Sequence, residues 1–338
     1  MRILIAAALF GIGSAAIARD LPVPPDKGWQ HATTGLVLMP IIAGEQRTAL
    51  TDSGERELDV AAQYGSGDGP VSITIYLFRP GLDDVALWFD RVDTEVRGRD
   101  TFGGVTPAAA APVAFSRPGS AIADSLRMVY TPQKGPYHST GAAMMPLGDW
   151  LVSVRISSKL DNAQQLAAKL DAVIAGIRFP KDAAAGPVVA PIAECRSHIN
   201  YHHAKMQKVD PSQVLFGAIE GSIAEEHSAS GEQGERIRFC RDGTGTTRFG
   251  VYRQDDSSQS YWVAFNDAGQ AAFVSSGLGG LIGKGGFQVK SLTFDGIDVF
   301  PSFDKLPEPQ QVIDLIGRTE PLSHTAGKTI TLSNTTLS

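Results

Sequence analysis

Alternating apolar and polar residues mark a series of strands in the first half of the chain. The segment VSITIYLF (71–78) shows the pattern most clearly, because every second residue from Val71 to Leu77 is strongly apolar. Side chains of a strand point alternately to its two faces, so this period of two predicts a strand with one buried face. The segment DWLVSVRISS (149–158) has the same alternation. Further strands are predicted at 45–52, 57–64 and 125–131.

Each of the two clearest strands is followed by apolar residues at three- and four-residue spacing, which is typical of an amphipathic helix. We expect the first helix to start behind Asp83 or Asp84. The second is expected to start at Asp161, with Gln164 in the reciprocal position of a capping box. Both helices have a polar side, so we expect them to cover one face of a mainly antiparallel sheet, which is an α+β arrangement.

The stretch FPKDAAAGPVVAPIAEC (179–195) has the composition of a linker, with three prolines, a glycine and a run of alanines. Such residues interrupt regular structure. We therefore predict an α+β domain at 19–180, a linker at 181–193 and a β-rich α+β domain at 194–338. The length of the chain supports this division, because it exceeds what one hydrophobic core usually serves.

The second half is expected to hold a helix and then an antiparallel meander. Asp210 and Pro211 have the types favoured at a helix N-cap and first turn. Short apolar segments separated by turn residues follow, as in a meander of strands. These segments are 237–240, 246–254, 260–267 and 270–276, with a short helix after Pro307 and a last strand in KTITLS. The predicted fold is thus α+β, with two domains that each consist of a mainly antiparallel sheet with helices packed on it.

The segment GDWLVSVRISSKLDNAQQLAAKLDAVIAGIRFP, at the end of the first predicted domain, resembles the end of PsbP-like domains. In both, a strand that ends in small polar residues leads into a long final helix. The whole chain is also similar to uncharacterised exported bacterial proteins with the same order of parts. These resemblances imply a fold and an accessory or binding role, and they imply no catalytic residues.

The N-terminal residues have the layout of a secretory signal peptide. Arg2 precedes an apolar run that is too short to cross a bilayer, and Ala16 and Ala18 fit a small-residue cleavage site. We expect a signal peptide at 1–18, cleaved near Ala18, and a soluble periplasmic or secreted mature protein. No later stretch is apolar enough for a transmembrane segment.

The net charge of the chain bears on which classes of partner it can bind. The formal net charge is −6, and lysine and arginine form no cluster. Binding to nucleic acid depends on concentrated positive charge, so we expect no nucleic-acid partner. The sequence points to no cofactor, and it leaves the oligomeric state open.

Residues 194–203, ECRSHINYHH, hold one of the two cysteines and three of the seven histidines. If this stretch were helical, Cys195, His198 and His202 would share one face, where a metal ion could bind. The spacing of His198 and His202 matches that of HExxH zinc proteases, but Ile199 stands where the general-base glutamate is required. A metal site that uses His198, His202 and His203 is therefore the less favoured interpretation.

A disulfide between Cys195 and Cys240 is the favoured interpretation. Two cysteines of an exported chain usually pair, because the compartments outside the cytoplasm are oxidising. This bond would link the start of the second domain to its sheet. The three histidines would then be polar surface groups without a chemical role.

The glycine-dense loop at 277–287 is a candidate contact for a protein or envelope partner. Apolar side chains in a glycine-rich loop are unusual if the loop faces only water. The residues concerned are Leu278, Leu281, Ile282 and Phe287.

The favoured function is an exported accessory or binding protein of the cell envelope, without catalysis. One alternative is a hydrolase or metal-dependent enzyme whose site is assembled from distant residues. Another is a carrier of an apolar ligand held between helix and sheet in the first domain.

Overall fold

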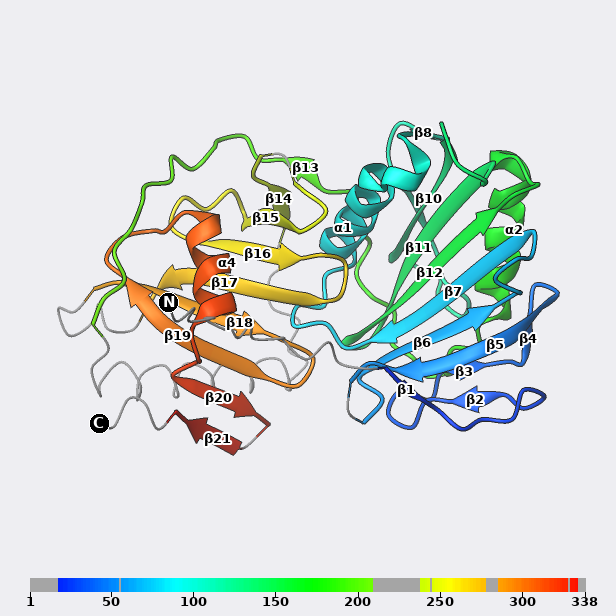
Figure 1. The fold of residues 1–338 in the computed structure, drawn as a ribbon, viewed down its shortest axis with the longest axis horizontal. Helices are drawn as coiled ribbons and strands as arrows, with labels where there is room; N and C mark the ends of the chain where they lie inside the picture. The colour runs from blue at the N-terminus through cyan, green and yellow to red at the C-terminus, as the bar shows by residue number, and fades with distance from the viewer. Residues whose placement is uncertain are drawn as a thin grey trace, which may run out of the picture.

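The computed structural model of the chain describes residues 18–54, 56–208, 238–243, 245–277, 285–327 and 329–333. Two large sheets lie side by side, and a helix lies between them (Figure 1). A sheet-dominated and mainly antiparallel fold is therefore confirmed. The helix predicted after Asp210 lies outside the described residues.

The first sheet contains the strands that the alternating segments predict, and all of its pairs are antiparallel. Its order is β1-β5-β6-β7-β12-β11-β10-β8, with β4 beside β5 and β9 beside β10. The strands are β1 (Arg19–Asp20), β4 (Ile41–Ile42), β5 (Glu45–Asp52), β6 (Asp59–Tyr64), β7 (Val71–Phe78), β8 (Val105–Pro107), β9 (Val113–Phe115), β10 (Ser125–Pro132), β11 (Ser139–Leu147) and β12 (Trp150–Ser158). A separate two-stranded ribbon joins β2 (Trp29–Gln30) to β3 (Val37–Leu38).

The two helices of the first sheet lie on opposite faces, so the expectation that both cover one face is wrong (Figure 1). The helix α2 (Ala163–Gly176) packs on the face that carries Met145 and Val154. The helix α1 (Val85–Gly98) packs on the other face, against Met144 and the neighbouring strands. The strand β11 is consequently buried on both faces along its whole length. This is why its sequence shows no alternation and does not mark it as a strand.

The helix caps agree with the sequence at one helix and differ by one residue at the other. Asp84 caps α1, since its side chain accepts a hydrogen bond from the Leu87 backbone N–H at 2.7 Å. The second helix is capped by Asn162, which forms a capping box with Gln165, and the prediction of Asp161 and Gln164 is wrong.

The carboxylate of Asp161 is occupied elsewhere. It accepts hydrogen bonds from the hydroxyl of Ser158 at 2.8 Å and from the ammonium of Lys169 at 2.7 Å. These bonds direct the side chain of Asp161 toward the end of β12, and the next residue is left to satisfy the helix N–H groups.

The second sheet is an antiparallel meander with one parallel strand at its edge. Its order follows the chain from β13 to β21. The strands are β13 (Ala193–Glu194), β14 (Phe239–Arg241), β15 (Phe249–Gln254), β16 (Tyr261–Phe265), β17 (Gln270–Ser276), β18 (Phe287–Leu292), β19 (Ile297–Phe303), β20 (Ser323–Ala326) and β21 (Thr329–Leu332). The helix α4 (Pro309–Arg318) covers one face, where Val312 and Leu315 join the core.

Helix α1 lies at the junction of the two sheets, and its Arg91 side chain is fully buried there. The guanidinium donates from Nε to the carbonyl of Asn266 at 2.6 Å, and from Nη2 to the carbonyls of Thr246 at 2.7 Å and Thr247 at 2.9 Å. The apolar cluster around α1 also includes Tyr252 from the second sheet. The two sheets therefore share one buried core at this junction.

The predicted linker follows the surface of the first sheet and is held there by hydrogen bonds. The buried Arg117 donates to the carbonyls of Ala183 at 3.2 Å and Ala184 at 2.6 Å. The backbone N–H of Gly186 donates to the carboxylate of Asp124 at 3.1 Å. The path between the sheets is thus fixed at several points.

None of the helices in the described part of the chain has the length and apolar character needed to cross a membrane.

Candidate functional site

A disulfide joins Cys195 to Cys240, as the sequence predicts. It lies beside the parallel pairing of β13 with β14, in which Ala193 is the partner of Cys240. The bonded cysteines are 45 residues apart in the chain. Closing a loop of this size corresponds to about 4 kcal/mol of stabilisation in the chain-entropy model.

The residues that follow Cys195 are not helical, so the helical face proposed for Cys195, His198 and His202 does not form. The backbone N–H of Cys195 donates to the carbonyl of Arg241 at 3.0 Å, which extends the contact between the chain and β14. The carbonyl of Ser197 accepts a hydrogen bond from the guanidinium of Arg253. Contacts to the second sheet therefore fix this segment, and it has no helical hydrogen bonds.

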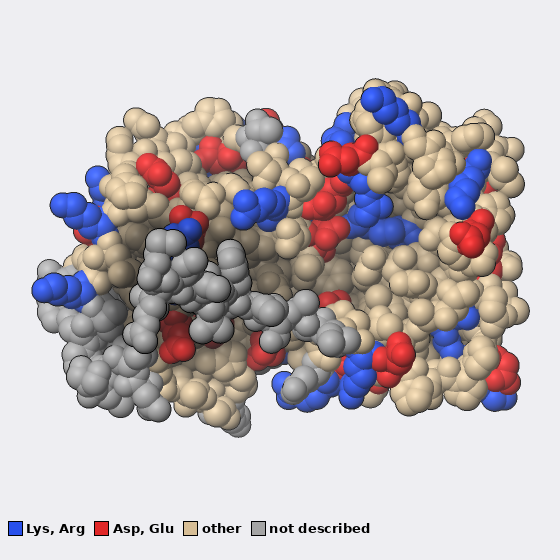
Figure 2. Space-filling view, viewed as in Figure 1, with Lys and Arg blue, Asp and Glu red and all other residues tan. Residues whose placement is uncertain are grey.

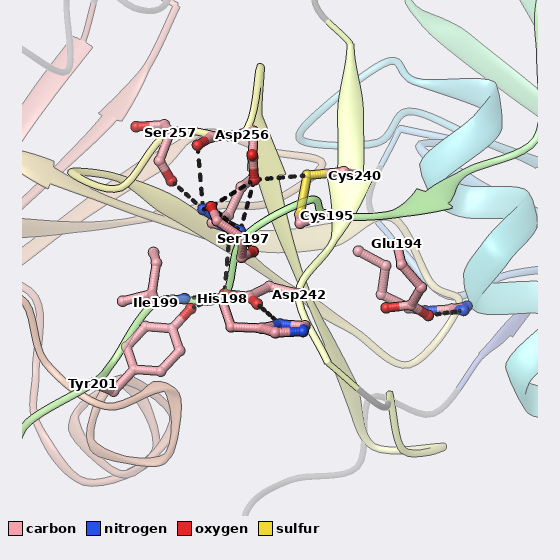
Figure 3. The surroundings of a disulfide bond; sticks show 12 residues. Glu194, Cys195, Ser197, His198, Ile199, Tyr201, Cys240, Asp242, Asp256 and Ser257 are labelled. Carbon is pink, nitrogen blue, oxygen red and sulfur yellow. Dashed lines mark hydrogen bonds and ion pairs between the residues drawn. A yellow bond between two sulfur atoms is a disulfide. The ribbon is translucent and has the colours of Figure 1, made fainter.

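A buried carboxylate, Asp242, lies at the centre of the site (Figure 3). Its side chain is only 3% exposed and follows β14 directly. It accepts hydrogen bonds from His198 Nδ1 and from the hydroxyl of Tyr201, both at 2.9 Å. Arg253 Nε lies 3.3 Å from Oδ2 of Asp242. Two side-chain donors and a guanidinium thus meet at this one carboxylate.

The contact with Asp242 fixes the tautomer of His198. An ionised carboxylate only accepts hydrogen bonds, so Nδ1 of His198 carries a proton. In the neutral ring, Nε2 then has a lone pair, and the side chain is 69% exposed. An imidazole oriented by a carboxylate in this way can accept a proton or bind a metal ion. That the three histidines are polar surface groups without a chemical role stays a prediction, and His198 is the one for which the described residues show a carboxylate partner.

The fully buried Arg253 connects Ser197 to the turn after β15. Its guanidinium donates to the carbonyl of Ser257 at 2.9 Å and lies 2.8 Å from the carboxylate of Asp256. Asp256 in turn lies next to the disulfide, 4.0 Å from the sulfur of Cys240. The ion pairs and the disulfide thus hold the same short segment from two sides.

The structure does not assemble a metal site from the three histidines. His202 and His203 are exposed, and within the described ranges they belong to no group whose ligand atoms converge. The group of this kind found there is Cys195, Cys240 and Asp256. Its sulfur atoms are joined to each other, so they offer no thiolates to a metal.

The proposed contact loop at 277–287 is only partly described. Phe287 begins β18, is half-buried and packs against the core on the α4 side of the second sheet. Leu278, Leu281 and Ile282 lie outside the described residues.

A second polar cluster lies where β13 and β14 meet α1. The carboxylate of Asp90 accepts hydrogen bonds from Arg241 and from the hydroxyl of Tyr252, each at 2.7 Å. Arg241 also donates to Glu194 at 3.0 Å. Burial raises the pKa of Asp90, and the hydrogen bond from Tyr252 and the charge of Arg241 oppose this rise. Arg241 therefore connects the edge strand of the second sheet to the helix of the first.

A shallow cleft lies at the opposite end of the junction, between the loop after β7 and the turn from β18 to β19. Its wall includes Arg79, Asp149 and Phe294. Arg79 is paired with Asp149 at 3.0 Å. Acidic and basic side chains are visible along the seam between the two halves of the molecule (Figure 2). Asp83 also lines the cleft, so the cleft carries one basic and two acidic side chains.

Sequence reasoning missed the residues that organise the site, namely Asp242, Arg253 and Tyr201. Asp242 precedes a glycine, and that pair indicates a turn. Arg253 lies in a strand where a charged residue is expected to face water. Only the three-dimensional position of the 195–201 segment reveals their role.

No protein-family model matches the chain, and no match is found among curated proteins or solved structures. The similarity of the first sheet to PsbP-like domains therefore stays a prediction.

Proposed function

We propose that this chain is an exported accessory or binding protein of the cell envelope, without catalysis, built from two α+β domains. The observation that carries the proposal is the Cys195–Cys240 disulfide. Structural disulfides persist in oxidising compartments and are rare in the cytosol. The signal-like sequence of residues 1–18 supports the same location.

The contacts between the two sheets support a binding role in which the protein acts as one rigid body. Domains joined by a small polar interface usually move relative to each other. Here the junction includes the buried Arg91, three carbonyls in loops between strands of the second sheet, and an apolar cluster with residues from both sheets. A partner would therefore meet a surface whose two halves keep their relative positions.

Fractionation of host cells tests the proposed location. The chain is expected in the periplasmic or secreted fraction, and its N-terminal sequence is expected to begin near Arg19. A chain that keeps residues 1–18 and fractionates with cytosolic markers would contradict the proposal.

The His198–Asp242 pair favours a second candidate, metal-dependent or hydrolytic chemistry at the exposed imidazole. His202 is a matched control, because it is also exposed and has no carboxylate partner among the described residues. Titration with Zn²⁺, followed by NMR of the histidine rings, measures binding. Stoichiometric binding that is lost in His198→Ala and kept in His202→Ala would favour this candidate over the first.

The third function considered from the sequence is a carrier of an apolar ligand between helix and sheet. In the first sheet this space is filled, since Leu166, Leu170 and Val173 of α2 are fully buried against the strands. A ligand there would have to displace them. A native mass spectrum of protein purified from its host is expected to show the polypeptide mass alone, and an added small-molecule mass would support the carrier instead.

A further inference from the structure

The last strand of the second sheet, β21 (Thr329–Leu332), forms an edge of that sheet in the described part of the chain. All its residues are exposed, including the apolar Ile330 at 44% and Leu332 at 46%. An edge strand presents unpaired backbone N–H and C=O groups, which another strand can use.

The other edge strands of the two sheets carry features that oppose strand addition. Natural proteins block exposed edges with charge, proline and short length. Strand β1 consists of Arg19 and Asp20, β4 has two residues and follows Pro40, β8 contains Pro107, β9 follows Pro112, and β13 has two residues and contains Glu194. Strand β21 is longer than each of these, and its sequence, Thr-Ile-Thr-Leu, has neither charge nor proline.

The hydrogen bonds of the β20–β21 hairpin show which backbone groups face the open edge. Ala326 pairs with Thr329 and His324 pairs with Thr331. The N–H of Ser333 donates to the carbonyl of Leu322 at 3.0 Å, which continues the same series. In an antiparallel ladder, hydrogen-bonded pairs alternate with non-bonded pairs. The odd-numbered residues of β21 therefore direct their backbone groups toward β20, and Ile330 and Leu332 direct theirs to the open edge.

We propose that two copies of the chain associate by antiparallel pairing of β21 with β21, around a two-fold axis at Thr331. In this register, Ile330 of one copy lies opposite Leu332 of the other, and each such pair exchanges hydrogen bonds in both directions through the outward backbone groups. The two-fold axis repeats the pair, so all outward groups of Ile330 and Leu332 are used. The second sheet then continues across both copies.

The side chains favour a second copy as the occupant of this edge. Across the axis, Ile330 lies beside Leu332 on one face and Thr331 lies opposite Thr331 on the other, so no like charges meet. Thr329 lies opposite Ser333, which is also uncharged. Because the contact is isologous, the assembly ends at two copies, and the β21 edge of each copy is covered. An interface this small predicts a weak dimer that dissociates on dilution. This inference does not depend on the proposed location of the protein.

Sedimentation velocity of the full chain over a range of concentrations tests the dimer. We expect reversible monomer–dimer exchange. Ile330→Pro is expected to abolish the dimer, because proline removes an outward N–H and leaves the bonds to β20 intact. Ile41→Pro, on the edge of the first sheet, is the matched control and is expected to leave the dimer unchanged.

A charge exchange at the axis tests the register without relying on proline. Thr331→Lys and Thr331→Glu each place like charges opposite one another, so each variant alone is expected to be monomeric. An equimolar mixture is expected to form a heterodimer, because lysine then lies opposite glutamate. A wild-type chain that stays monomeric at its highest soluble concentration would overturn the proposal, and so would a dimer that Ile330→Pro does not affect. A monomeric chain that binds a synthetic peptide of residues 329–333 would also overturn it, because the occupant would then be an unrelated strand.

Discussion

Asp242 accepts a hydrogen bond from His198 at 2.9 Å, although the two residues are 44 positions apart in the chain. The carboxylate is buried and the imidazole is mostly exposed. The contact therefore links a group that stabilises the fold to a group that is accessible to solvent. Changes at the two residues should have different effects.

Replacing Asp242 by asparagine is expected to destabilise the protein by about 2 kcal/mol, because the buried Arg253 loses one of its two carboxylate partners and keeps Asp256. Tyr201 also loses an ionised acceptor. Urea unfolding measures the change. His198→Ala is the control, and a change of about 0.5 kcal/mol or less is expected because that side chain is exposed. Equal losses in both variants would show that Asp242 does not hold the segment through Arg253.

Removing the disulfide with the double substitution Cys195→Ser and Cys240→Ser is expected to lower the free energy of unfolding by about 2–4 kcal/mol. Reductant should destabilise the wild-type protein by a similar amount and should leave the variant unchanged. Thermal unfolding with and without reductant measures both effects. A wild-type protein that is insensitive to a reductant shown to open the bond would contradict the prediction.

Replacing Arg91 by methionine is expected to uncouple the two sheets. The substitution removes the donor of three partly buried hydrogen bonds to carbonyls in the loops of the second sheet. Scanning calorimetry should show one transition for the wild type and two for Arg91→Met. The control is Arg97→Met on the same helix, because Arg97 is paired with Asp93 at a partly exposed position. One transition in both variants would mean that Arg91 does not couple the sheets.

The stability of the protein should depend on pH through the ionisation of Asp59. Burial, followed by the charges of Asp52 and of Asp267 from the second sheet, raises its pKa to about 6. In the unfolded chain this carboxyl ionises near pH 4. Ionisation therefore lowers the free energy of unfolding as the pH rises from about 4 to 6, and the loss of stability is complete above pH 6.

Asp59→Asn removes this penalty. The variant is expected to be more stable than the wild type by about 1–2 kcal/mol at pH 8, after allowance for solvent screening, and equal to it near pH 4. Asp68→Asn at an exposed position is the control and should show no such trend. Chemical unfolding at several pH values gives the comparison. A gain that is the same at both pH values would contradict a titrating Asp59.

The amphipathic strands and helices could be predicted from the sequence. Each packs one face against the core, so apolar residues recur along it at the period of a strand or of a helix. Strand β7 has the predicted bounds, since one of its faces lies in the same apolar cluster as α2 and its alternation is complete. Strand β11 could not be predicted, because α1 and α2 cover both of its faces and apolar residues occupy consecutive positions. For the same reason, the sequence could not show that the helices lie on opposite faces.

Of the candidate site, only the disulfide could be predicted from the sequence. Two cysteines in a chain that is predicted to be exported leave one intramolecular pairing, so the Cys195–Cys240 bond could be predicted from composition. The partners of His198 come from β14 and β15, and their positions depend on the parallel pairing of β13 with β14. No local pattern encodes that pairing, because β13 has only two residues.

We propose that the chain is exported and that its disulfide forms outside the cytoplasm. Peptide mapping tests this proposal, with the chain produced with and without residues 2–18 in a bacterial host and with free thiols alkylated before lysis. We expect the complete chain to yield the Cys195 and Cys240 peptides joined to each other, and the shortened chain to yield both peptides alkylated. A complete chain in which both cysteines are alkylated would contradict it.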